Sequence, residues 1–142
     1  MANTVRELIL QEFVTRITPL GINPVGRAEP SLEESDEPLY TVHDGVEERH
    51  ENQSYGTTRV NLIVTVELGM SSLTPSPSIN EQLGDVIKAV IGTDSTFAGL
   101  ANNITYAGSS PTYRVDGSVY SGIQCLFNVD YSYPIGDPFQ TV

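Results

Sequence analysis

Apolar residues recur every three or four positions near the start of the chain, in residues 4–17. This spacing places them along one side of an α-helix and predicts an amphipathic helix. Thr4 and Glu7 match a capping box, in which the threonine caps the helix and the glutamate reaches back to the N-cap backbone. We expect Pro19 to follow the end of this helix.

The same spacing returns in residues 78–91 and predicts a second amphipathic helix. Ser78 and Glu81 match another capping box, so we expect the helix to begin there. Gly92 follows as a stop signal. The preceding residues, 69–77, are rich in serine and proline and read as a linker.

Strict alternation of apolar and polar residues marks two long strands, 57–68 and 119–133. In the first strand one face is apolar: Val60, Leu62, Val64, Val66 and Leu68. The other face is mostly polar, which is typical of an antiparallel sheet with one buried face. Shorter strands are predicted at 39–46, with a turn at Asp44–Gly45, and at 102–107 and 111–116. Residues 47–56 read as a loop or frayed hairpin tip, and 93–100 as a turn or short helical piece.

The order of these elements predicts an α+β fold in one domain, residues 1–142. We expect a mixed or antiparallel sheet of about five strands with two helices packed on one face. Fifteen residues of strand span about 50 Å, longer than strands in most small domains. The last strand therefore either bends or projects onto a neighbouring subunit of a ring.

Charge is unevenly distributed, with a formal net charge of -11 from 18 acidic and 7 basic residues. Acidic residues and prolines crowd residues 18–38, which read as a solvated loop. The bases are scattered, which argues against a protein that grips a nucleic-acid backbone. No apolar run approaches the ~20 residues that cross a membrane, and the first residues do not read as an export signal.

Residues with catalytic or metal-binding chemistry are few. His43 and His50 lie near acidic residues, but a zinc or iron site needs three or four converging ligands, so solvated side chains are expected. Cys125 falls on the apolar side of the last strand and reads as a reduced core thiol. No nucleophile elbow, dinucleotide-binding loop or P-loop is present, so we expect neither an enzyme nor a bound cofactor.

Taken together, the layout resembles the bacteriophage tail terminator family, which includes the minor tail protein U group. The resemblance covers most of the chain and rests on the order of four segments: TVRELILQEFVTRI, TRVNLIVTVEL, INEQLGDVIKAVI followed by DSTFAGL, and VDYSYPIGDP. Two features depart from the family pattern. The loop 18–38 is long and acidic, and basic residues are few.

The resemblance implies a structural role in the virion. Members form rings, typically hexameric, at the neck-proximal end of the tail tube. There they end tube polymerisation and provide the surface that joins the neck or head-completion protein. The implied partners are therefore further copies of the chain, the tail tube protein and the neck protein. Assembly is expected in the host cytoplasm, and DNA is expected to pass through an acidic lumen without specific binding.

Candidate contact residues for the ring or the tube lie mainly in the last strand and just after it. Aromatic side chains are favoured in such contacts, and Phe139 follows the strand break at a position expected to be exposed. The full candidate set is Tyr131, Tyr133, Asp137, Phe139, Arg49 and Arg59.

Three other interpretations remain open on sequence alone. One is a head-completion or neck adaptor, or a tail-tube subunit, which also build rings from small β-rich subunits. Another is a small metal-binding enzyme that uses His43, His50 and nearby acids. The last is a bacterial interaction module.

Overall fold

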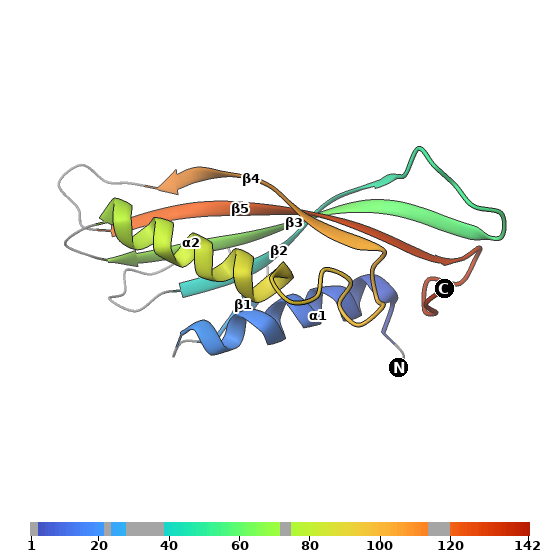
Figure 1. Ribbon diagram of the computed structural model, residues 1–142, viewed down its shortest axis with the longest axis horizontal. Coiled ribbons are helices and arrows are strands. Elements are labelled where there is room, and N and C mark those ends of the chain that lie inside the picture. The colour runs from blue at the N-terminus through green and yellow to red at the C-terminus, as the bar shows by residue number, and fades with distance from the viewer. Residues whose placement is uncertain (1–2, 22–23, 28–38, 72–74, 114–119) are drawn as a thin grey trace.

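The computed structural model describes residues 3–21, 24–27, 39–71, 75–113 and 120–142 (Figure 1). Most of the predicted acidic loop, residues 22–23 and 28–38, lies outside these ranges. The described part contains two helices, α1 (Val5–Ile17) and α2 (Pro75–Ile91), and a 3₁₀ turn at Thr18–Leu20.

One five-stranded sheet, in the order β1-β2-β3-β5-β4, forms the centre of the fold. The strands are β1 (Gly26–Arg27), β2 (Leu39–Arg49), β3 (Thr57–Ser71), β4 (Asn103–Tyr113) and β5 (Tyr120–Pro134). The short β1 runs parallel to β2, and every other pair is antiparallel. The predicted α+β class, with a mixed sheet of five strands, is confirmed.

Both helices pack on one face of the sheet (Figure 1). The alternation predicted for β3 is confirmed, because Val60, Leu62, Val64, Val66 and Leu68 all lie in the buried core. Phe13 of α1 meets Phe97, from the turn after α2, edge-on with ring centroids 5.0 Å apart. Cys125 is fully buried, as predicted, and burial raises the pKa of its thiol to about 12.

The start of α1 confirms one half of the predicted capping box. The backbone N–H of Glu7 donates to the Thr4 hydroxyl over 3.1 Å. The Glu7 carboxylate does not complete the box, because it accepts two hydrogen bonds from Arg27, at 3.0 and 3.1 Å. These bonds lower the pKa of Glu7 and tie α1 to β1.

The start of α2 was predicted wrongly, because the helix begins at Pro75 and Ser78 lies inside it. Proline is compatible with the first turn of a helix, where backbone N–H groups lack intrahelical partners. The end at Ile91 agrees with the prediction, and the N–H of Gly92 still donates to the Lys88 carbonyl over 2.9 Å.

β2 continues through the predicted turn at Asp44–Gly45 and reaches Arg49. A β-bulge lies there instead, since Asp44 pairs with Val64 and Glu47 with Leu62. A Cβ on Gly45 would lie 2.3 Å from the carbonyl oxygen of Ile63, so this position requires glycine. The bulge puts Asp44 and Glu47 on the same, helix-covered side of the sheet.

Two other boundaries also differ from the sequence prediction. β3 extends to Ser71 and takes in part of the predicted linker. The two short strands expected at 102–107 and 111–116 form one strand, β4, with register shifts between Tyr106 and Gly108 and between Pro111 and Tyr113. Glycine and proline, which read as turn residues in the sequence, therefore give register shifts inside β4, because pairing with the long strand β5 continues on both sides of them.

Candidate functional site: an arm at the end of the sheet

One end of the sheet extends beyond the two helices as an arm (Figure 1). The arm consists of residues 47–49 of β2, the hairpin loop 50–56, residues 57–61 of β3 and residues 130–134 of β5. β3 and β5 pair along their whole lengths, from Thr57 with Pro134 to Ser71 with Tyr120. The long last strand therefore projects as part of a paired ribbon.

From Tyr131 to Pro134, the outer edge of β5 has no strand partner within the described residues. β4 begins at Asn103, which pairs with Asp130, so the ladder between β4 and β5 stops there. Beyond that point β3 is the one strand partner of β5 in the described part of the chain. An open strand edge can pair with a strand of another subunit.

The helix-facing side of the arm is anchored by Tyr131. Tyr131 is 3% exposed, and its hydroxyl donates to the carboxylate of Glu47, on the other side of β3. Burial, followed by the hydrogen bond to Glu47, raises the pKa of Tyr131. Arg6 of α1 also approaches Glu47, at 3.4 Å. Tyr133 is half-buried, with its ring centroid 6.2 Å from that of Tyr131.

The opposite side of the arm carries a polar network centred on Asp130. Arg59 donates to both carboxylate oxygens, over 2.9 and 2.6 Å, and Asn102 donates to one of them over 3.2 Å. His50 lies 3.9 Å from the same carboxylate. The hydrogen bonds from Arg59 lower the pKa of Asp130 even though partial burial opposes that shift.

The chain folds back after β5 and returns to α1. The N–H of Ile135 donates to Gly56 over 3.1 Å, and the N–H of Val5 donates to the carbonyl of Pro138 over 2.9 Å. The Asp137 carboxylate accepts the N–H of Phe139 over 3.1 Å, so it closes a local turn. The Phe139 side chain remains 51% exposed.

The predicted contact residues are therefore brought to one end of the molecule but divided between different surfaces. Tyr131 and Tyr133 face the helix side, whereas Arg59 faces the other side. Arg49 is exposed and has no ion pair within the described residues. Three further exposed apolar residues of the arm and the C-terminal segment were missed by the sequence reading: Tyr55, Ile135 and Val142.

No group of three or more histidine, cysteine, aspartate or glutamate side chains in these ranges is arranged to hold a metal ion. His43 sits within β2 opposite Thr65, and His50 lies at the arm beside Asp130. No described helix is long and apolar enough to cross a membrane.

Comparison with known proteins does not place the chain in a family. No protein-family model matches it, and no curated protein sequence matches it.

Proposed function

We propose that this protein is a structural subunit of a phage tail that assembles as a ring on the neck-proximal end of the tail tube. The ring ends tube polymerisation and offers the joining surface for a neck or head-completion protein. One observation carries the proposal: the paired β3–β5 ribbon extends the sheet beyond its own helices, with an open β5 edge and exposed apolar residues at its end.

The arm is compatible with a closed ring. If it contacts a different surface on its neighbour, the interface is head-to-tail. Repetition of that interface gives a ring when the rotation closes. Tyr55, Ile135 and Phe139 supply apolar contact area at this end, and the β5 edge supplies backbone hydrogen-bonding groups.

The charge distribution supports a ring through which DNA passes without being bound. Six of the seven lysines and arginines are described, and four of them form ion pairs with acids of the same chain: Arg6, Arg16, Arg27 and Arg59. Few cations are left to bind phosphate, and the net charge of -11 repels DNA.

Native mass spectrometry over a range of protein concentrations, with and without tail tubes, tests the proposal. A closed oligomer of about six copies, or binding to tube ends that arrests tube growth, is the expected result. A chain that stays monomeric, binds no tube end and leaves tube length unchanged would refute it. Binding to a portal in preference to a tube would identify a neck adaptor instead.

A further inference from the structure

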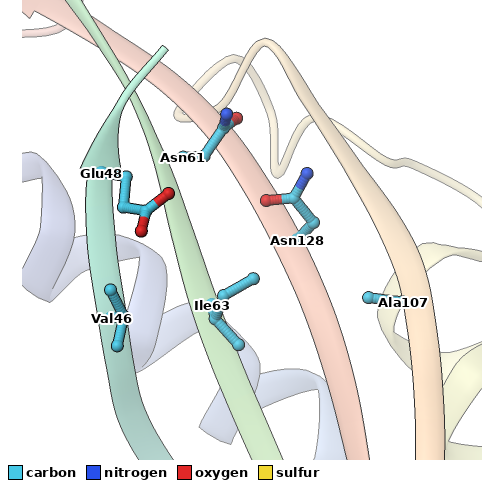
Figure 2. A pocket seen from close by; sticks show the side chains of 6 residues that line it. All are labelled: Val46, Glu48, Asn61, Ile63, Ala107 and Asn128. Atoms are coloured by element: carbon cyan, nitrogen blue, oxygen red, sulfur yellow. The ribbon is translucent and has the colours of Figure 1, made fainter.

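The helix-free side of the sheet carries a groove of about 440 Å³ that reaches into the arm at Glu48 and Asn61. It is lined by side chains of four strands: Val46, Glu48, Asn61, Ile63, Ala107 and Asn128. Figure 2 shows them on neighbouring strands, with the three polar groups toward one end and the three apolar groups toward the other.

Two β-bulges create the apolar end of the groove. The bulge in β2 places Gly45 and Val46 opposite Ile63, and Val46 is 65% exposed as a result. The register shift in β4 leaves Ala107 unpaired between Tyr106 and Gly108, where it is exposed. Bulges redirect side chains in this way and often lie beside functional sites.

The polar end holds hydrogen-bonding capacity that the described residues leave unused. Glu48 pairs in the ladder with Asn61, and Asn128 pairs with Ile63. None of the three polar side chains has a hydrogen-bond or ion-pair partner in the described part of the chain. Arg59, the base on the same side of β3, is already bound to Asp130.

We propose that this groove binds a lysine or arginine side chain presented by an extended segment of a different protein. The aliphatic stem lies over Val46, Ile63 and Ala107, and the cationic head meets the Glu48 carboxylate and the side-chain carbonyls of Asn61 and Asn128. Long cationic side chains combine an apolar stem with a charged head in the way this groove requires.

Charge favours a foreign basic segment over a second copy of this chain. Only Arg49 and Lys88 among the described bases lack an acidic partner, whereas the whole chain carries a net charge of -11. A basic segment of another protein is therefore attracted to this acidic chain more strongly than a second acidic copy is. This inference does not depend on ring formation, because the groove lies within one subunit.

Nuclear magnetic resonance titration of the full chain tests the inference with two short peptides. One is acetyl-Val-Arg-Val-amide, and the other replaces arginine with citrulline, which keeps the shape without the charge. We expect the arginine peptide to shift the signals of Ile63, Ala107 and the Asn61 and Asn128 side-chain amides. We expect the citrulline peptide to bind at least about tenfold more weakly, the usual effect of losing a charged hydrogen bond.

Glu48→Gln is the test variant and Glu51→Gln the control, since both remove one exposed carboxylate near the hairpin loop. Glu48→Gln should lower the affinity for the arginine peptide about tenfold, and Glu51→Gln should leave that affinity unchanged. Equal binding of the two peptides, equal effects of the two variants, or shifts confined to Glu81 and Asp85 on α2 would overturn the inference. So would a homo-oligomer that Glu48→Gln dissociates in light scattering, because the occupant would then be a second copy.

Discussion

Arg59 and Asp130 lie on neighbouring strands and form a two-point ion pair, with nitrogen–oxygen distances of 2.9 and 2.6 Å. The side chain of Asp130 is only 16% exposed, so this guanidinium mainly serves the fold of its own subunit. Arg59 was predicted as a contact residue for a ring or a tube. Its position gives it a partner already, which leaves Arg49 as the unpaired base of the arm in the described residues.

The ion pair between Arg59 and Asp130 should make the free energy of unfolding decrease as the pH falls into the acid range. The folded-state pKa of Asp130 lies below its ordinary value of 3.8, so its contribution is complete above about pH 4. That contribution is lost as the pH falls through the lower, folded-state pKa. We expect Asp130→Asn to be less stable than wild type at pH 7 and to lose less stability on acidification, as measured by urea unfolding between pH 7 and pH 2. Asp85→Asn, at an exposed position of α2, should retain the wild-type pH profile.

Gly45→Ala should destabilise the protein by about 1–3 kcal/mol, because its Cβ would overlap the Ile63 carbonyl in the β2 bulge. Gly84 of α2 provides the matched control, since a Cβ there meets nothing within 4 Å. Gly84→Ala should stabilise the helix by about 0.5–1 kcal/mol. Urea unfolding measures both. Equal stability of Gly45→Ala and wild type would show that the bulge does not require glycine.

Tyr131→Phe should lower the free energy of unfolding by about 1 kcal/mol, because it removes the hydroxyl that donates to Glu47 across β3. The loss is moderate, since Arg6 still accompanies the Glu47 carboxylate. Tyr133→Phe is the control, because its hydroxyl has no hydrogen bond to a described residue. Thermal unfolding compares the variants, and equal midpoints for both would argue that the Tyr131 hydroxyl contributes nothing to the arm.

Ala98→Gly should stabilise the turn after α2 by about 1 kcal/mol. Phe97 and Ala98 have backbone φ angles of 51° and 55°, a region that glycine occupies without the penalty paid by alanine. Ala89→Gly, within α2, should have the opposite sign and cost about 1 kcal/mol. Chemical unfolding distinguishes the two, and a loss of stability in Ala98→Gly would contradict the prediction.

Phe139→Ala should weaken assembly of the oligomer about tenfold and leave the subunit folded. The Phe139 side chain is half-exposed, and the turn that carries it is held by the bond from the Phe139 N–H to the Asp137 carboxylate, which the substitution keeps. Gln140→Ala, at the adjacent exposed position, should assemble normally. Sedimentation measures assembly, and circular dichroism checks the fold. Unchanged assembly of Phe139→Ala would remove this residue from the interface.

The pattern of side chains was enough to predict most of the fold. Apolar alternation identified β3 and β5, helical spacing identified α1 and the end of α2, and the position of Cys125 predicted a buried thiol. These features depend on which way successive side chains point along one segment, and that direction follows from the local backbone period.

The contacts in the arm could not be predicted in the same way, because they depend on the register between strands that lie far apart in the sequence. The bulge at Gly45 exists because residue 63 lies opposite it, and it is this bulge that brings Glu47 to Tyr131. Read alone, Asp44–Gly45 has the composition of a turn. The ion pair between Arg59 and Asp130 likewise joins residues 71 positions apart.

The sequence by itself determined most of the elements, the apolar face of β3 and the α+β class, because periodicity is a local property of the chain. The tertiary structure alone decided where α2 begins, which of the described bases lack an ion-pair partner, and how β3 and β5 combine into an arm. It also decided that Glu48, Asn61 and Asn128 share one groove on the open side of the sheet. Cross-strand pairing sets these relationships, and a change of register by one residue would turn each side chain to the other face.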